Sequence, residues 1–203
     1  MNVSHPSAAI PAPCTKDSFR RGKSVLGFPR DFVALDLETT GLRASADAII
    51  EVGCIRFRDG RPAEKFETFI NPERRIGRFI TRLTGITDAM VGDAPRFADT
   101  ADAIWDFIGD DLIVGHNVGF DVGFLFSKFN SLDGRVFAND YVDTLRIFRR
   151  CCPALPHHRL TDLTDFFGIR TVHHRALADA EAAATGLRLL EAYSAEHGIR
   201  FGR

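Results

Sequence analysis

The segment that most constrains the fold is the alternating run at residues 32–38, Phe-Val-Ala-Leu-Asp-Leu-Glu, which is typical of a β-strand. Asp36 and Glu38 lie two residues apart, so both side chains leave the same face of this strand. Burying ionised carboxylates costs several kcal/mol for each ion. The face must therefore reach solvent at a sheet edge or meet a positive charge such as a metal ion. The turn expected at residues 39–41 favours a site at the strand end, although this pair alone leaves both interpretations open.

The remaining pattern predicts one mixed sheet flanked by helices, an α/β fold. Two β-rich runs, at 49–57 and 65–70, follow the first strand through short turns and predict an antiparallel meander. From residue 95 onward, helical spacing alternates with short strands. Helices are expected at 95–110, 118–129, 160–167 and 175–196, a strand at 112–115, and a brief strand followed by a helix at 141–150. We expect one domain at residues 31–203 and find no internal repeat.

Charge and composition exclude several classes of protein. The chain has 203 residues, with 26 Lys and Arg against 27 Asp and Glu, so it lacks the basic surplus of a protein that coats DNA. An enzyme that binds only a few nucleotides at the end of a strand needs no such surplus of basic residues. No apolar run approaches the roughly 20 residues that span a bilayer, so we expect no membrane association. The four cysteines show no disulfide framework, which predicts a reducing compartment, the cytoplasm.

Residues 1–30 are expected to be a disordered N-terminal tail, because they are rich in Ser, Ala and Pro and lack a periodic apolar pattern. They also lack the apolar segment of a secretory signal, and an organellar transit peptide is a lesser alternative. Near the other end of the chain, the cysteines and histidines at 151–158 match none of the common zinc-ligand spacings. We therefore expect a loop there and no structural zinc.

Two further segments carry candidate functional side chains. Residues 115–121, Gly-His-Asn-Val-Gly-Phe-Asp, predict a strand end, a bend and a helix that opens with Asp121. An acid in a first helical turn also suits the helix dipole, so Asp121 alone is weak evidence for a functional site. His174 and Asp179 are five residues apart, about 140° around a helix, and cannot share a face. If they act together, His174 must lie in the loop before the helix, while His173 is expected to face solvent.

Taken together, three motifs resemble those of the DEDDh exonucleases. They are Asp36-Leu-Glu38-Thr-Thr-Gly41, His116-Asn-Val-Gly-Phe-Asp121 and His174-Arg-Ala-Leu-Ala-Asp179. Leu83-Thr-Gly-Ile-Thr87 and Val142-Asp-Thr-Leu145 are also similar to segments of these proteins, and the resemblance extends over residues 31–195. It is greatest to the proofreading (epsilon) subunit of bacterial DNA polymerase III and to PolC-type exonuclease domains. The resemblance implies an RNase H-like fold and a 3′→5′ exonuclease that releases nucleoside 5′-monophosphates from single-stranded DNA.

The resemblance also implies a role for each site residue. Asp36, Glu38, Asp121 and Asp179 would hold two metal ions, and an all-carboxylate site favours Mg²⁺ or Mn²⁺. Asp36 would bridge both ions, Glu38 and Asp179 would lie on the nucleophile side, and Asp121 would hold the second ion. His174 would be the general base, because a histidine titrates near neutrality.

The candidate substrate-binding residues surround these positions. Thr40, Leu42 and Phe120 resemble residues that contact the terminal nucleotide, while His116 and Asn117 are expected mainly to brace their loop. The full candidate set is Thr39, Thr40, Gly41, Leu42, His116, Asn117 and Phe120. Two other functions stay open: an RNA-directed 3′→5′ exoribonuclease, and a non-catalytic nucleic-acid-binding module that accompanies a polymerase. The expected substrate partner is a single-stranded DNA 3′ end, with RNA possible. Two arrangements stay open: a stand-alone enzyme, and a subunit of a DNA polymerase.

Overall fold

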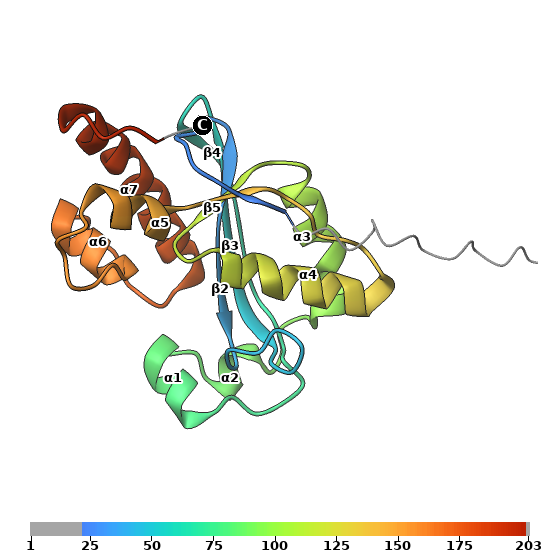
Figure 1. Cartoon of the computed structure of the whole chain (residues 1–203). Helices are drawn as coiled ribbons and strands as arrows, with labels where there is room; N and C mark the ends of the chain where they lie inside the picture. Colours follow the sequence, from blue (N-terminus) through green and yellow to red (C-terminus); the bar gives the residue numbers. More distant parts are fainter. Residues whose placement is uncertain (1–21, 202–203) are drawn as a thin grey trace, which may run out of the picture.

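A six-stranded mixed sheet forms the centre of this computed structural model, which describes residues 22–201 (Figure 1). The strands lie in the order β1-β6-β5-β2-β3-β4. β2, β3 and β4 pair in antiparallel fashion, and β2, β5, β6 and β1 pair in parallel. The strands are β1 (Ser24–Val25), β2 (Phe32–Thr39), β3 (Ile49–Arg58), β4 (Arg61–Phe69), β5 (Ile113–Gly115) and β6 (Tyr141–Asp143). The predicted mixed sheet with an antiparallel meander is confirmed.

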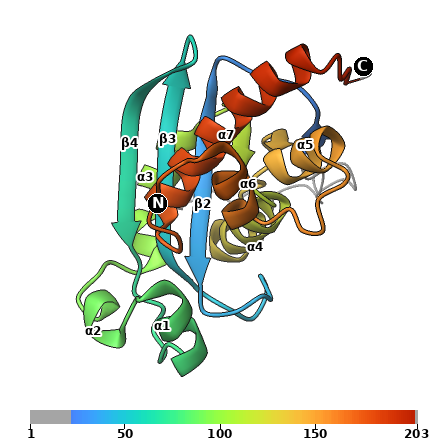
Figure 2. The same ribbon diagram turned by 90° about the vertical axis from the view of Figure 1, so that its left-hand side faces the viewer.

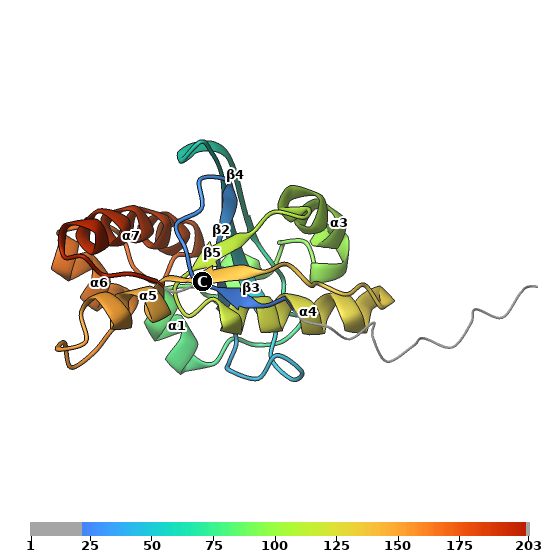
Figure 3. The same ribbon diagram turned by 45° about the horizontal axis from the view of Figure 1, so that its top comes forward.

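Helices cover both faces of this sheet (Figures 1 and 3). α5, α6 and α7 lie on one face, and α3 and α4 lie on the other. α1 and α2 lie beyond the carboxyl end of β2 (Figure 2). The helices are α1 (Arg78–Thr84), α2 (Asp88–Val91), α3 (Phe97–Ile108), α4 (Gly119–Asp133), α5 (Thr144–Cys151), α6 (Leu160–Phe167) and α7 (Ala176–Glu196). Among the described residues, no helix combines the length and apolar character needed to span a membrane.

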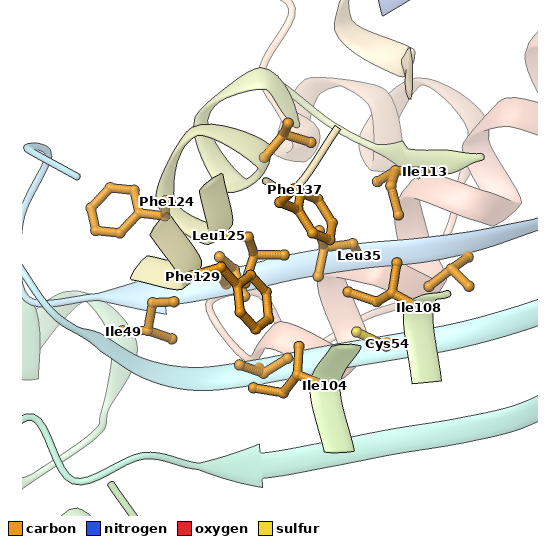
Figure 4. Close-up of a cluster of buried hydrophobic side chains, with 14 of the residues drawn as sticks. Leu35, Ile49, Cys54, Ile104, Ile108, Ile113, Phe124, Leu125, Phe129 and Phe137 are labelled. Atoms are coloured by element: carbon orange, nitrogen blue, oxygen red, sulfur yellow. The ribbon is translucent and has the colours of Figure 1, made fainter. Parts of the chain in front are cut away.

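The alternation along β2 divides its side chains between two hydrophobic cores. Val33, Leu35 and Leu37 join the core under α3 and α4, where Leu35 lies near Phe129 (Figure 4). Phe32 and Ala34 point the other way, into the core under α5, α6 and α7. Burying a large apolar side chain contributes about 1.5–3 kcal/mol. The two cores therefore fix the direction of every β2 side chain, including those of the two acids that follow.

Three local expectations differ from the structure. The expected tail reaches residue 30, whereas Ser24–Val25 pairs with β6 and Val25, Leu26 and Phe28 pack against the second core. Residues 1–21 of that tail lie outside the described part of the chain. The pattern predicted neither α1 nor α2. The third strand was expected from residue 65, but β4 begins at Arg61, immediately after the tight turn at Asp59–Gly60.

Candidate active site

β2 presents Asp36 and Glu38 on the face of the sheet that α7 covers. They continue the alternation of Phe32 and Ala34, whose side chains lie in the core under α7. Across the sheet, Asp36 is paired with Gly53 of β3. A Cβ atom on Gly53 would lie 2.2 Å from the backbone nitrogen of Leu177, so the missing side chain lets the first turn of α7 rest directly on the sheet.

Asp121 is held against β2 by a backbone hydrogen bond. β5 ends at Gly115 and its pairing with β2 reaches only Ala34, so the next part of β2 has no strand neighbour on that side. The carboxylate of Asp121, in the first turn of α4, accepts a hydrogen bond from the backbone N–H of Leu37 (3.0 Å). Buried backbone donors need such a partner. The end of β5 thus brings the opening of α4 next to Asp36 and Glu38.

His116 and Asn117 brace the bend between β5 and α4. The His116 ring lies between the Thr144 hydroxyl (Nδ1, 2.9 Å) and the carbonyl oxygen of His158 (Nε2, 2.8 Å). Asn117 adopts a left-handed conformation (φ 61°), and its N–H donates to Asp143 Oδ1 (2.8 Å). Both ring nitrogens of His116 are engaged, which agrees with the bracing role expected from the sequence.

His174 lies in the loop before α7, as its spacing from Asp179 predicts. It adopts a left-handed backbone conformation (φ 63°), and its N–H donates to Asp179 Oδ2 (2.9 Å). Ligand atoms of Glu38, His174 and Asp179 all lie within 4.8 Å of one another. Asp36 and Asp121 do not belong to that group, although both are close enough for their charges to act on the site.

The expectation that His173 faces solvent is wrong. Its side chain is only 25% exposed, and its Nδ1 lies 3.2 Å from Asp179 Oδ1. Its Nε2 lies 3.1 Å from the hydroxyl of Thr164 on α6. Because His174 occupies the left-handed position, the ring of the preceding residue turns inward, toward the same carboxylate.

An ion pair between the buried Glu51 and the partly exposed Arg175 lies beneath the site, and the sequence pattern did not predict it. Glu51 of β3, the sheet partner of Glu38, is fully buried, and its carboxylate accepts hydrogen bonds from the Arg175 guanidinium (2.8 and 3.0 Å) and from the Ala176 N–H (3.0 Å). Arg175 directly follows His174 and precedes α7. The pair therefore fixes the start of α7 to β3. The signal available in the sequence was a lone acid within the apolar run at 49–57.

The carboxyl groups of the site oppose each other's ionisation. Burial raises the pKa of Asp36, and the charges of Asp121 and Asp179 raise it further. Burial, followed by the charges of Asp179 and Glu51, raises the pKa of Glu38 from 4.5 to about 8. Burial also raises the pKa values of Asp121 and Asp179, against the lowering effect of their backbone hydrogen bonds. The cluster consequently needs added positive charge to stay ionised at neutral pH.

Divalent metal ions suit this set of donors. Four carboxylates converge from β2, α4 and α7, and the guanidinium of Arg175 is already hydrogen-bonded to Glu51. Oxygen-rich sites prefer hard cations such as Mg²⁺ and Mn²⁺. Elsewhere in the described residues, no group of three or more His, Cys, Asp or Glu side chains has ligand atoms as close as those of Glu38, His174 and Asp179. The repulsion within the cluster and the chemistry of its donors both fit a metal site.

The turn after β2 exposes one apolar side chain beside the acids. The Thr39 hydroxyl donates to the Gly41 carbonyl (2.7 Å), and the Thr40 hydroxyl accepts from the Ala48 N–H (2.9 Å), so both threonines shape the turn. Leu42, at its tip, is 84% exposed. Phe120 is partly buried and packs against Phe124, with ring centroids 4.7 Å apart. Of the two apolar candidates for substrate binding, Leu42 is thus more accessible than Phe120.

Solved structures with similar folds are exonucleases. Exonuclease X in complex with 5′ overhanging duplex DNA superposes with a TM-score of 0.63 over 82% of this chain and 93% of its own, at 24% identity. Escherichia coli Exonuclease I in complex with a dT13 oligonucleotide gives a TM-score of 0.72 over 84% of this chain and 43% of its own, at 22% identity. At these identities the likeness establishes the fold, which is RNase H-like.

Sequence relatives lead to the family. The chain is 43% identical over 152 residues (74% of its length) to the DNA polymerase III PolC-type of Oceanobacillus iheyensis. It is 41% identical over 172 residues (84% of its length) to that of Bacillus subtilis. It spans only 11% and 12% of the length of these two relatives. The exonuclease family RNase_T matches residues 33–187, which include all five acidic and histidine positions of the site. This chain therefore belongs to the RNase_T exonuclease family, whose members generally use divalent metal ions.

Proposed function

We propose that this protein is a 3′→5′ exonuclease that removes nucleotides one at a time from single-stranded DNA with the help of two Mg²⁺ or Mn²⁺ ions. The observation that carries the proposal is the convergence of Asp36, Glu38, Asp121 and Asp179 with His174. The charges of Asp121 and Asp179 raise the pKa of Asp36, and the charge of Asp179 raises that of Glu38. Ligand atoms of His174 lie within 4.8 Å of those of Glu38 and Asp179. Such a cluster is costly to the fold and is explained by a catalytic role.

Each residue has a distinct task in this mechanism. Bound divalent ions would neutralise charge on the scissile phosphate and make the attacking water more acidic. Asp36, Glu38, Asp121 and Asp179 would hold the ions, and Glu38 and Asp179 would serve the side of the attacking water because they lie beside His174. His174 takes the proton of that water, and the 3′-oxygen departs from the phosphorus. The product is a nucleoside 5′-monophosphate.

The geometry around Leu42 supports attack at a chain end. The side chain stands 84% exposed at the tip of the turn after β2, where a planar base can pack against it. The neighbouring Asp47 carboxylate accepts the Arg43 N–H (2.8 Å) and fixes this turn. We infer that this turn contacts the terminal nucleotide while the carboxylates act on its phosphate. The similarity to PolC-type DNA polymerases supports a proofreading or repair role, in which a DNA polymerase would be the partner. The corresponding localisation is the cytoplasm.

The experiment that tests this proposal uses strands of one sequence, as DNA and as RNA, labelled at the 3′ or the 5′ end. With Mg²⁺ or Mn²⁺, 5′-labelled DNA should give a ladder that shortens from the 3′ end, and 3′-labelled DNA should give labelled mononucleotide. EDTA and the variant Asp179→Asn should both stop the reaction. Cuts within circular single-stranded DNA would contradict the exonuclease direction, and faster degradation of RNA would assign the protein as an exoribonuclease.

A further inference from the structure

A surface of mixed basic and apolar character lies on α1 and has no part in the site described above. We call it the α1 surface, and its residues are Arg75, Arg78, Phe79, Arg82 and Leu83. All three arginines are exposed, and none forms an ion pair or a side-chain hydrogen bond within residues 22–201. Phe79 is 67% exposed and Leu83 is 43% exposed. Side chains four residues apart share a helix face, so two arginines and two apolar residues form adjacent stripes.

The arginines border an open hollow of about 940 Å³. Arg75, Arg78 and Arg82 contribute three positive charges to its lining, against the single negative charge of Asp88. That carboxylate is already engaged, because its Oδ1 accepts the backbone N–H of Ile76 (2.8 Å). The hollow is therefore positively charged, in a chain whose overall formal charge is −1.

The α1 surface is rigidly attached next to the carboxylate site. Ile80 of α1 packs into a small core with Ile50 and Phe69 of the sheet. Ile50 directly precedes Glu51, the buried partner of Arg175. The Arg175 guanidinium also lies over the Phe69 ring, 5.4 Å from its centroid. In two views at right angles, α1 lies beyond the end of β2 on the side of the sheet that carries α7 (Figures 1 and 2).

We propose that the α1 surface binds the part of a single strand that lies upstream of the nucleotide being removed. This inference rests on the proposed function, because it needs a strand whose 3′ end occupies the carboxylate site. The arginines match the phosphates by charge, and arginine forms strong charge-assisted hydrogen bonds with phosphate oxygens. Phe79 offers an exposed ring on which a base can stack, and this combination of basic and aromatic side chains is common in proteins that bind single strands. A polyanion explains the unpaired arginines better than a protein partner does.

The test compares a long and a minimal substrate in steady-state kinetics with Mn²⁺. The long substrate is oligothymidylate of roughly 16 nucleotides, the upper end of the length that one single-strand-binding module covers. The minimal substrate is the p-nitrophenyl ester of thymidine 5′-monophosphate, which has no upstream strand. The variants are the double substitution Arg78→Gln with Arg82→Gln, and Phe79→Ala. The control is Arg30→Gln with Arg61→Gln, which removes the same charge from exposed positions beside the turn at Gly60.

We expect the α1 double variant to raise KM for the oligonucleotide about tenfold and to flatten its salt dependence by about 0.7 in log–log slope per lost phosphate contact. Phe79→Ala should raise the same KM about tenfold without changing the salt slope, because stacking involves no counterions. Neither variant should alter hydrolysis of the ester. Equal KM values for the α1 and control double variants would overturn the proposal and leave a protein as occupant of the surface. Loss of ester hydrolysis in the α1 variants would overturn it as well, whereas a wild-type protein inactive on both substrates would refute the proposed function itself.

Discussion

Replacing Glu38 by glutamine should stabilise the metal-free protein at neutral pH. Burial and the charges of Asp179 and Glu51 raise the pKa of Glu38 from 4.5 to about 8. Glutamine keeps the shape of the side chain and removes its charge. The variant therefore relieves the repulsion that, in the wild-type protein, only bound cations or protons can relieve.

The size of the effect follows from proton linkage. Because the pKa in the folded state lies above that in the unfolded state, the native protein binds more protons between pH 4.5 and about 8. The free energy of unfolding therefore falls as pH rises through this window. At about 1.4 kcal/mol per pKa unit, the shift corresponds to about 5 kcal/mol. This value is an upper limit, because Asp36 and Asp179 take up protons in place of Glu38, so we expect about 2–3 kcal/mol near pH 7.5.

Urea denaturation in EDTA at a series of pH values between about 5 and 8 measures this difference. The wild-type free energy of unfolding should decline across the series more steeply than that of Glu38→Gln. Adding Mn²⁺ should reverse the order, because only the wild type keeps the full set of ligands. Glu196→Gln, at an exposed position near the end of α7, is the matched control and should follow the wild type. Parallel pH profiles for wild type and Glu38→Gln in EDTA would refute the electrostatic account of the site.

Three further predictions concern other parts of the site. Asp36→Ala and Asp179→Ala should each reduce cleavage below detection while circular dichroism stays unchanged, and retained activity in either would contradict the metal assignment. His174→Ala should lower kcat by about 10²–10⁴-fold, with the Mn²⁺-induced rise in Tm retained; loss of that rise would make His174 a metal ligand instead of the base. Arg175→Ala should lower the free energy of unfolding by about 3 kcal/mol, because it leaves Glu51 buried without its partner. An unchanged urea midpoint in Arg175→Ala would contradict the stabilising role assigned to the pair of Glu51 and Arg175.

Elements with strong periodicity could be predicted from the sequence. The β2 and β3 runs alternate regularly or form a continuous apolar stretch, and α6 and α7 end at glycines or close to them. β1 was missed because its two residues are held by pairing with β6, more than a hundred residues away. α1 was missed because it has only seven residues and buries only Thr84 fully, so its apolar side chains Phe79 and Leu83 form no core-facing stripe.

In the candidate site, too, features set by local geometry could be predicted from the sequence, whereas features set by distant contacts could not. Asp36, Glu38 and the loop position of His174 follow from local geometry, namely the two-residue repeat of a strand and the angle between successive helical residues. Glu51 and Arg175 do not, because their pairing depends on the register that sets Glu51 opposite Glu38. The inward turn of His173 depends on the left-handed conformation of the residue that follows it. Sequence patterns indicate which face a side chain takes, but they do not give the partner that it meets across the sheet.

The close approach at Gly53 also determines which part of the site can move. With no side chain between them, β3 and the first turn of α7 are in direct backbone contact, and Ala180, Ala184 and Leu187 continue that contact in the core. Asp179 is therefore fixed relative to the sheet, and a displacement of α7 would open a void along the contact between β3 and α7. The residues just before the helix are held by a few hydrogen bonds, to its first turn and to Thr164 of α6. Any motion that adjusts the site to successive nucleotides should therefore occur in the 169–174 loop. It should be faster than a separation of α7 from β3.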